Sequence, residues 1–332
     1  MKIQKSTTRA SLKGIGLSIL ALVLIIIGSL FIPWNMGALP SDHHPVQSYE
    51  EAVQSLDRMR AERRAEMNPD CRLQLLTHGR KAHNVIILVH GYTNCPAQFG
   101  ELGQKFYDLG YNVLISPLPH HGLADRLNDE QGKLTIEELT KYADNMVDLA
   151  HGLGEHITMM GISGGGVITA WAAQNRSDLD TAIIISPAFG YQQIPTRFTI
   201  PVMNFVQIMP DSFEWWDSDL KGNAGPAHAY PRYSKHALAE ILRLGFAVQN
   251  EALWNSPAAR QVIVITNAND PSVNNEMTAN VIKRWQKHSA NIETYEFPSS
   301  LGLAHDLIDP EQPGQRVDIV YPQLIELINQ AE

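Results

Sequence analysis

A serine between glycines is the residue of this chain best placed for chemistry. Residues 161–165 match G-x-S-x-G, a pattern in which the serine lies on a tight turn between a strand and a helix. Glycine suits such a turn because a Cβ would clash at positive φ and where two backbones approach closely. The pattern predicts that Ser163 is a nucleophile, and a glycine-rich loop with an incidental serine is the alternative.

A base and an orienting acid follow two later strands of the predicted fold. Asp270 comes after the apolar run 261–265, and His305 comes after the predicted strand 293–297. Catalytic groups of a parallel sheet lie at the carboxyl ends of its strands, and the order Ser163, Asp270, His305 is the one expected with such a serine turn. We therefore predict a triad in which Asp270 orients His305 and His305 deprotonates Ser163. If each residue is considered alone, His305 could instead have a structural role, and Asp270 could instead cap a helix.

Two backbone N–H groups would complete an acyl-transfer site by binding the oxyanion. Gly164, directly after the nucleophile, is predicted to supply one of them. The other is expected from the loop 90–96, which follows the apolar run 85–89, and Tyr92 is the candidate residue.

The two cysteines, Cys71 and Cys95, are predicted to form a disulfide that braces the oxyanion loop, with two free thiols as the alternative. His120 and His121 follow the predicted strand 112–115 and are candidates for the rim of the site. No metal is expected there, because neither H-E-x-x-H nor a third spaced ligand accompanies them. No cofactor is expected either, since phosphate-binding and dinucleotide-binding glycine motifs are missing from the sequence.

Strands and helices alternate from about residue 70 onward, which predicts an α/β fold with a doubly wound, mostly parallel sheet. The apolar, β-branched run 85–89 is typical of a central parallel strand. Thr135 is a predicted N-cap for a helix over 135–149. The alternation breaks at about 190–251, where prolines and aromatic residues predict an inserted cap over an apolar pocket. The other expected elements are strands 156–160 and 182–185 and helices 99–109, 166–173, 234–248, 273–288 and 321–329.

An uncharged, largely apolar run precedes this domain. Residues 14–34 are long enough to cross a bilayer as a helix, and the tail 1–13 carries four basic residues and no acidic one. The positive-inside rule therefore predicts a single-pass anchor in the cell membrane, with a cytoplasmic N-terminus and an extracytoplasmic domain, periplasmic or extracellular. A cleavable signal peptide is the alternative, but the run is longer than usual and residues 36–38 make a poor cleavage site.

Residues 35–69 are predicted to form a linker and a juxtamembrane helix. Ser48 and Glu51 match a capping box that opens a helix over 49–67. We expect this helix to pack on the edge of the domain 70–332, with a place on the membrane surface as the alternative.

Charge and composition exclude one class of partner. The chain has 332 residues, a net charge of −9 and an ordinary globular composition with 44% hydrophobic residues. An acidic protein repels phosphate backbones, and no basic stripe offsets that repulsion. Nucleic acid is therefore not an expected partner.

Together these motifs resemble the α/β-hydrolase superfamily. Within it they are similar to the bacterial carboxylesterase and monoacylglycerol-lipase-like group, which overlaps the serine aminopeptidase S33 group. The resemblance covers about residues 73–332, and it implies a cap over the active site and an acyl-enzyme route without a cofactor. The matching segments are His-Gly-Tyr-Thr at 90–93, His-Gly at 121–122, the serine turn at 161–165, D-x-x-V at 270–273 and H-x-x-x-D at 305–309.

We therefore expect a membrane-anchored serine hydrolase that cleaves small-molecule or lipid-like carboxylic esters, with an acyl group of medium length. The aromatic cap and the predicted membrane location favour that class of substrate. The alternatives are an S33-type aminopeptidase, a thioesterase or acyltransferase with the same triad, and a non-catalytic binding protein on this scaffold.

Overall fold

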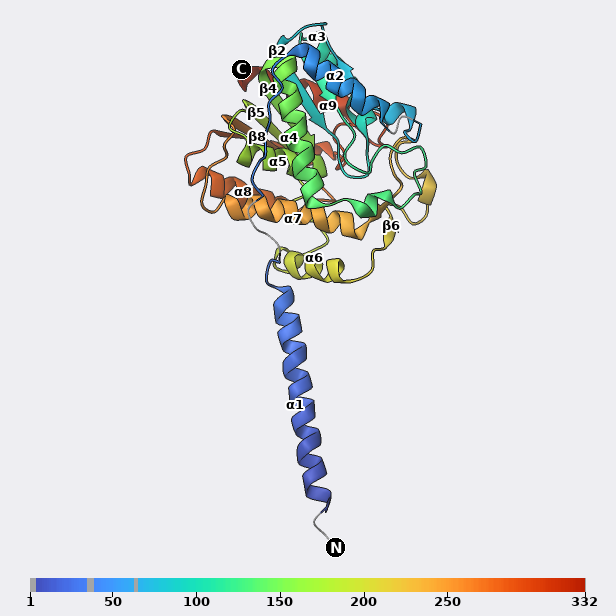
Figure 1. The fold of residues 1–332 in the computed structure, drawn as a ribbon, viewed down its shortest axis with the longest axis vertical. Helices are drawn as coiled ribbons and strands as arrows, with labels where there is room; N and C mark the ends of the chain where they lie inside the picture. Colours follow the sequence, from blue (N-terminus) through green and yellow to red (C-terminus); the bar gives the residue numbers. More distant parts are fainter. Residues whose placement is uncertain (1–3, 35–38, 63–64, 332) are drawn as a thin grey trace.

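A seven-stranded sheet forms the centre of the structure (Figure 1). The structure is a computed structural model that describes residues 4–34, 39–62 and 65–331. All neighbouring strands are parallel except the edge strand β1, which pairs antiparallel with β3. The predicted doubly wound, mostly parallel sheet is therefore confirmed. In sheet order the strands are β1 (Gln74–Leu76), β3 (Asn112–Ile115), β2 (Ala82–Val89), β4 (Gly154–Ile162), β5 (Thr181–Ile185), β8 (Gln261–Asn267) and β9 (Ile292–Phe297).

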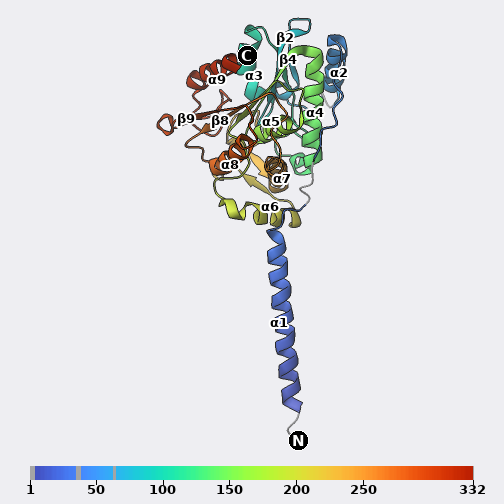
Figure 2. The same ribbon diagram turned by 90° about the vertical axis from the view of Figure 1, so that its left-hand side faces the viewer.

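Helices cover both faces of this sheet, as Figure 2 shows. The side chains of β2 alternate: Ile86 and Leu88 pack with α3 and α9, whereas Val85 and Ile87 pack with the helices of the opposite face. Because strand side chains point alternately to the two faces, a run that is apolar throughout implies cover on both sides. One face is covered by α3 (Gly100–Asp108) and α9 (Val317–Ala331), and the other by α2 (Tyr49–Ala61), α4 (Ile136–Leu153), α5 (Gly164–Asn175), α7 (Lys235–Glu251) and α8 (Asn275–Gln286).

The segment between β5 and β8 forms an additional layer beside the sheet. It contains α6 (Thr199–Ile208), a two-stranded ribbon of β6 (Phe213–Trp215) and β7 (Arg232–Ser234), and α7. Met203 of α6 packs against Ala239 and Leu242 of α7, which holds α6 on the outside of the domain.

The helix predicted over 49–67 is shorter in the structure and ends at Ala61. Residues 63–64 lie outside the described residues. From residue 67 onward the backbone is hydrogen-bonded to another part of the chain and not to the preceding turn of α2. Met67 forms a β-bridge with Leu123, and the Asn68 N–H donates to the Gly122 carbonyl at 2.9 Å. The prediction was wrong at this end because long-range pairing of the backbone outcompetes continuation of the helix.

A buried arginine ties the linker to the main domain. Arg176, at the end of α5, has a fully buried side chain that donates to Asp144 at 3.0 Å and to Asp148 at 2.7 Å, both on α4. It also makes hydrogen bonds of 2.8 Å with both carboxylate oxygens of Asp178.

The two α4 carboxylates also bind the linker. Asp144 accepts hydrogen bonds from the Ser41 hydroxyl at 2.5 Å and from the Asp42 N–H at 2.9 Å. Asp148 accepts the His44 N–H at 2.7 Å, and the Trp171 indole N–H donates to the Leu39 carbonyl at 2.9 Å. Residues 39–46 therefore run as a strap along α4 and α5.

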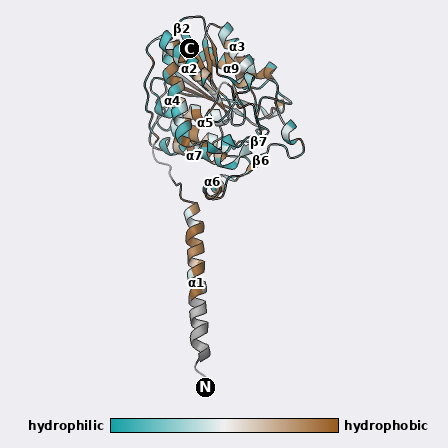
Figure 3. Ribbon diagram, turned by 45° about the vertical axis from the view of Figure 1, so that its right-hand side comes forward, coloured by the Kyte–Doolittle hydropathy of each residue, from teal (hydrophilic) through white to brown (hydrophobic). Residues whose placement is uncertain are grey.

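The first helix, α1 (Gln4–Leu30), projects away from the domain (Figure 1). Its domain-proximal part is strongly hydrophobic (Figure 3). Among the described residues, no helix meets the requirements of length and apolarity for a membrane crossing together. The transmembrane anchor over 14–34 stays a prediction. Two segments used in the argument for it, the start of the basic tail at 1–3 and the poor cleavage site at 36–38, lie outside the described residues.

Arg176→Met should destabilise the domain by about 3–5 kcal/mol, because it leaves buried carboxylates without their counter-charge. Denaturant unfolding measures this change. Arg260→Met is the matched control: Arg260 is 74% exposed and pairs with Asp180 at 2.9 Å, so its loss should cost at most about 1 kcal/mol. Equal effects of the two substitutions would contradict the structural role of Arg176.

Candidate active site

The serine turn joins β4 to α5 and carries a backbone conformation rarely found outside glycine. Ser163 has φ +56° and ψ −115°. The flanking glycines make this turn possible, because a Cβ at Gly165 would lie 2.2 Å from the Val89 carbonyl oxygen of β2. A Cβ at Gly161 would likewise lie 2.2 Å from the Gly165 carbonyl oxygen. The turn therefore holds Ser163 at the carboxyl edge of the sheet.

Asp270 and His305 meet at the same edge, after β8 and β9. The His305 Nδ1 lies 2.8 Å from Asp270 Oδ2 and 3.0 Å from Oδ1. Asp270 Oδ1 also accepts the backbone N–H groups of Ser272 and Val273 at 2.9 and 3.0 Å, which fixes the carboxylate. Nδ1 is thereby engaged as a donor, and Nε2 is the nitrogen with which His305 could accept a proton from a substrate-facing group. The structure does not join Ser163 to this pair by a hydrogen bond between described atoms.

The pairing changes the acidity of both side chains. Burial disfavours the charged imidazole, but the hydrogen bond and charge of Asp270 outweigh it and raise the pKa of His305 above 6.5. Burial also opposes ionisation of Asp270, but His305 and the two backbone donors hold the pKa of that carboxyl below its ordinary value. Asp270 is thus an ionised partner that stabilises a protonated His305.

The two predicted oxyanion donors lie side by side. A Cβ on Gly164 would be 3.3 Å from the Tyr92 backbone nitrogen, and one on Gly91 would be 3.6 Å from the Ser163 Cβ. The Tyr92 side chain instead extends to Ser234, at the end of β7, where its hydroxyl accepts the Ser234 N–H at 3.0 Å. The loop after β2 therefore packs directly on the serine turn.

A neutral histidine orients the Tyr92 peptide. His90 Nδ1 lies 2.8 Å from the Gly91 carbonyl, and its Nε2 accepts the Leu118 N–H at 2.9 Å, so Nδ1 must carry the proton. Burial, with the nearby His121, lowers the pKa of His90 to about 3, which keeps this ring neutral. The Gly91 carbonyl belongs to the same peptide unit as the Tyr92 N–H, so His90 fixes the direction of that donor.

The paired histidines have different surroundings. Burial lowers the pKa of His121 to about 4, and its Nδ1 lies 2.8 Å from the Pro119 carbonyl while Nε2 accepts the Thr93 N–H at 3.5 Å. His120 instead faces two carboxylates, with Nε2 3.1 Å from Glu138 and Nδ1 3.4 Å from Glu130. His121 thus supports the oxyanion loop, and His120 ties its own loop to the start of α4. No metal-ligand cluster occurs among the residues that the structure describes.

The predicted disulfide is confirmed. Cys71 and Cys95 are bonded, with 5.2 Å between their Cα atoms and a sequence separation of 24 residues. Cys71 ends the short 3₁₀ turn Pro69–Cys71, and Cys95 directly precedes the turn Pro96–Phe99 in the oxyanion loop. The bond therefore fastens that loop to the segment before β1.

No pattern in the sequence indicates the residue that connects the oxyanion loop with the segment after β9 that carries His305, here called the histidine loop. Buried Gln98 accepts the Gly91 N–H at 2.8 Å and donates from its amide to Asp306 Oδ2 at 2.7 Å. Asp306 is next to His305, and burial together with the charge of Asp309 raises the pKa of its carboxyl. Adjacency to His305 was the one local indication for Asp306, whereas nothing near Gln98 in the sequence indicates this contact.

His228, which the sequence did not single out, joins the cap insertion to Asp309, the last residue of the H-x-x-x-D motif. His228, from the insertion, lies with Nε2 2.8 Å from the fully buried Asp309. Asn94 of the oxyanion loop donates to the same Asp309 oxygen at 3.0 Å. Asp309 therefore links the insertion, the oxyanion loop and the histidine loop.

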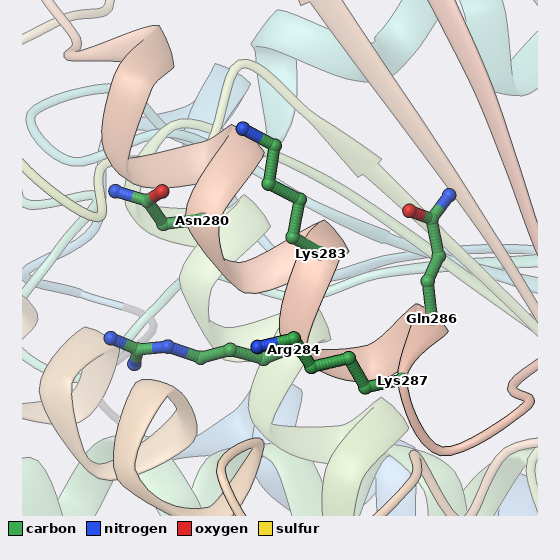
Figure 4. A pocket seen from close by; sticks show the side chains of 5 residues that line it. All are labelled: Asn280, Lys283, Arg284, Gln286 and Lys287. Carbon is green, nitrogen blue, oxygen red and sulfur yellow. The ribbon is translucent and has the colours of Figure 1, made fainter.

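A pocket on α8 is lined by none of these residues (Figure 4). Its side chains come from α8 and from Lys287, the C-cap of that helix, and none of them is a predicted site residue. Arg284 is already engaged, since it donates to the Gln249 carbonyl at 2.6 Å. The lining residues are Asn280, Lys283, Arg284, Gln286 and Lys287.

Comparison with known families gives one match over most of the domain. The family model described as serine aminopeptidase, S33, matches residues 80–308. That range contains the serine turn, the oxyanion loop, Asp270 and His305.

Two curated relatives match over shorter ranges. Phospholipase YtpA of Bacillus subtilis (strain 168) is 28% identical over 111 residues, which are 32% of this chain and 42% of that protein. The thermostable monoacylglycerol lipase of Bacillus sp. (strain H-257) is 24% identical over 165 residues, 48% of this chain and 60% of that protein. The chain thus spans about half the length of the curated relatives that it matches.

Solved structures share the fold at low identity. A structure reported for LipS and LipT, two metagenome-derived lipolytic enzymes, matches with a TM-score of 0.60 and 17% identity, covering 80% of this chain and 100% of that one. The monoacylglycerol lipase of Paleococcus ferrophilus matches with a TM-score of 0.58 and 17% identity, covering 78% and 98%. At this identity the likeness shows a common fold.

The His305–Asp270 pair predicts the pH dependence of turnover. A base acts only when neutral, so a raised pKa means that kcat/KM should rise with pH through a midpoint above 6.5. Asp270→Asn should move that midpoint down and reduce kcat by about 10⁴-fold, because the orienting acceptor is lost. Pre-steady-state and steady-state rates of ester hydrolysis across pH measure both effects.

Asp318→Asn is the control for this profile. Asp318 is an exposed carboxylate on α9 paired with Arg316, so its removal should leave the midpoint unchanged. A midpoint at or below 6.5 in the unaltered protein would be incompatible with the pairing described.

Removing the disulfide should affect both stability and rate. Cys71→Ser with Cys95→Ser should lower the free energy of unfolding by about 3 kcal/mol on the chain-entropy model. If the Tyr92 N–H donates to an oxyanion, as predicted, the loss should also reduce kcat more than it raises KM, because such a donor acts mainly on the transition state. Unchanged unfolding and unchanged kcat would show that the bond does not brace the oxyanion loop.

Proposed function

Since the chain belongs to the serine aminopeptidase S33 family of α/β-hydrolases, we propose that it is a serine hydrolase that cleaves carboxylic esters. The observation that carries this proposal is the His305–Asp270 hydrogen bond at the sheet edge that also bears the strained Ser163 turn. An acid, a base and a nucleophile at one edge of a sheet support acyl transfer.

In the proposed reaction, Ser163 Oγ attacks the ester carbonyl carbon while His305 Nε2 takes the hydroxyl proton. Asp270 keeps His305 in the required tautomer and stabilises its charged form. The N–H groups of Tyr92 and Gly164 donate to the oxyanion of the tetrahedral intermediate. His305 then gives its proton to the departing alcohol, which leaves an acyl group on Ser163.

Water then hydrolyses the acyl-enzyme, and His305 again acts first as a base and then as an acid. His305 accepts a proton from water, the resulting hydroxide attacks the acyl carbon, and the acid leaves as Ser163 recovers its proton from His305. No cofactor enters these steps, because the nucleophile, the base and the oxyanion donors all belong to the chain.

We propose a medium-chain or lipid-like acyl ester as the substrate. The cap segment is rich in apolar side chains, and the two curated relatives are named as a phospholipase and a monoacylglycerol lipase. Binding an acyl chain requires an apolar surface next to the nucleophile, and the side of the cap that faces the main domain would supply it.

The proposed location is the outer side of the cytoplasmic membrane, with the apolar N-terminal helix as the anchor. The basic residues before the apolar run favour this orientation. The Cys71–Cys95 bond also favours it, because disulfides persist in oxidising compartments.

Ser163→Ala should abolish hydrolysis of p-nitrophenyl acyl esters and labelling by a fluorophosphonate probe, because the attacking oxygen is removed. The expected loss of kcat is about 10⁶-fold, down to the rate left by binding and the oxyanion donors. Ser256→Ala, at an exposed serine after α7, is the control and should retain full activity. Undiminished turnover by Ser163→Ala would overturn the proposal.

A substrate comparison separates the family's namesake activity from ester hydrolysis. Aminoacyl p-nitroanilides and acyl esters of increasing chain length should be offered to the same full-length protein. We expect kcat/KM to be highest for esters with a medium acyl chain. Faster cleavage of the aminoacyl amides would favour an aminopeptidase with the same triad.

A further inference from the structure

The outer face of α6 is apolar and exposed to solvent. Phe198, Val202, Phe205 and Ile208 are 37–53% exposed and recur at helical spacing, so they lie along one side of the helix. The opposite side is buried against α7 through Met203. We define this outer face as the α6 face.

No charged residue interrupts α6, which makes its solvent side unusual. Its polar side chains Asn204 and Gln207 are engaged, with the Leu30 carbonyl and with Glu240, so apolar side chains make up the solvent side. Contiguous exposed apolar surface marks a site of interaction with a protein or a membrane. The α6 face therefore calls for a covering surface that is itself apolar.

The end of α1 is fastened directly beside this face. Asn204, which is 2% exposed, donates from its amide to the Leu30 carbonyl at 2.7 Å and to the Ile32 carbonyl at 2.8 Å. The Leu30 carbonyl is one of the last in α1 and lacks an intrahelical partner, so Asn204 caps the helix. The rings of Phe31 and Phe198 also meet, with centroids 6.4 Å apart.

This joint makes α1 and α6 adjacent parts of one surface. Figures 1 and 2 both place α6 at the point where α1 leaves the domain. The apolar surface of α1 thus continues onto the α6 face through Phe31 and Ile32, which are 48% and 58% exposed.

The exposure of the α1 side chains indicates what kind of surface covers α1 and the α6 face. Residues 22–27 are six consecutive apolar residues, each 44–68% exposed, and together they pass round the whole helix. A partner helix would cover one stripe of such a helix and leave the rest in water. An apolar environment on every side is what lipid provides.

We propose that the α6 face lies on a lipid bilayer, at the level of the acyl-chain boundary, beside the point where α1 enters it. Asn204 holds the cap insertion at a fixed height and angle on that surface. The apolar face of α6 then lies in lipid, as the apolar face of an interfacial helix does. The other side of an interfacial helix faces water, whereas the other side of α6 packs on the protein.

This inference rests on the lipid association of α1 in the proposed function but not on the hydrolytic chemistry. It adds that the cap insertion, and not the helix alone, contacts lipid. The cap would then face the bilayer, from which a lipid-like ester could move beneath it without crossing water.

Site-directed spin labels on the full-length chain test this placement. Phe205→Cys puts a label on the α6 face, and Leu109→Cys puts a control label on a residue that is 51% exposed at the end of α3, far from α1 (Figure 1). The Cys71–Cys95 bond leaves the introduced thiol as the site of labelling. The proteins are reconstituted in phosphatidylcholine vesicles, and label accessibility to oxygen and to a water-soluble nickel chelate is measured.

We expect the label at position 205 to be more accessible to oxygen than to the nickel chelate, and the label at 109 to show the reverse. Equal, water-like accessibility at both positions would overturn the proposal, as would failure of the chain to associate with the vesicles. Protection of the 205 label from both reagents would also overturn it, because it would mean that protein covers the face.

Activity provides a second, separable measurement. Phe205→Ser with Ile208→Ser should reduce hydrolysis of an ester lipid in vesicles about tenfold, through lost apolar contact. Hydrolysis of a soluble p-nitrophenyl ester should stay unchanged, because both side chains are more than half exposed on the outer face and not on the side of the cap that faces the domain. Leu109→Ser should change neither rate. If Ser163→Ala shows that the chain is not an esterase, the spin labels still decide the placement of α6. A water-like label at 205 with Ser163-dependent hydrolysis would overturn the placement alone.

Discussion

The close approach of two backbones at the serine turn is the constraint on which the site depends. The Val89 carbonyl at the end of β2 occupies the space that a Cβ of Gly165 would need. Since β2 and β4 are hydrogen-bonded neighbours, this contact brings the start of α5 against the strand end from which the oxyanion loop departs. The positions of Ser163, Gly164 and Tyr92 therefore follow from one packing condition, and only glycine satisfies it.

Hydrogen bonds from neutral and ionised side chains complete the arrangement around that contact. His90 serves the oxyanion peptide because burial keeps it uncharged and able both to donate and to accept. His305 has the opposite chemistry, since the ionised Asp270 favours its charged form. Gln98 connects the surroundings of His90 and His305, because it is hydrogen-bonded to both Gly91 and Asp306. A displacement of the histidine loop would therefore displace the oxyanion loop.

The features predictable from the sequence were those encoded locally. The apolar run of β2 predicted a buried parallel strand, and Thr135 is the N-cap of α4, as expected. Asp270 and His305 could be selected because each follows a strand, and the structure pairs them. The S33 family and the α/β-hydrolase fold followed from the same short motifs.

Features that depend on distant contacts could not be predicted in this way. The edge strand β1 is only three residues long and is defined by its pairing with β3. The early end of α2 reflects the bridge between Met67 and Leu123, which are far apart in the sequence. Gln98 likewise has no neighbour in the sequence that reveals its bond to Asp306. In each case the partner, and not the local pattern, determines the conformation.

The strap formed by residues 39–46 has a consequence for where the folded unit begins. The Asp42 and His44 N–H groups bind the Oδ2 atoms of Asp144 and Asp148, whereas Arg176 binds the two Oδ1 atoms. Ser41 donates to Asp144 Oδ1 beside Arg176. A shortened chain that starts at α2 would keep every strand of the sheet and yet expose this charged cluster and the indole of Trp171 to water. The packed part of the domain therefore includes the strap from Leu39, 35 residues before the first residue of β1, and a boundary drawn at the first strand would leave the strap out.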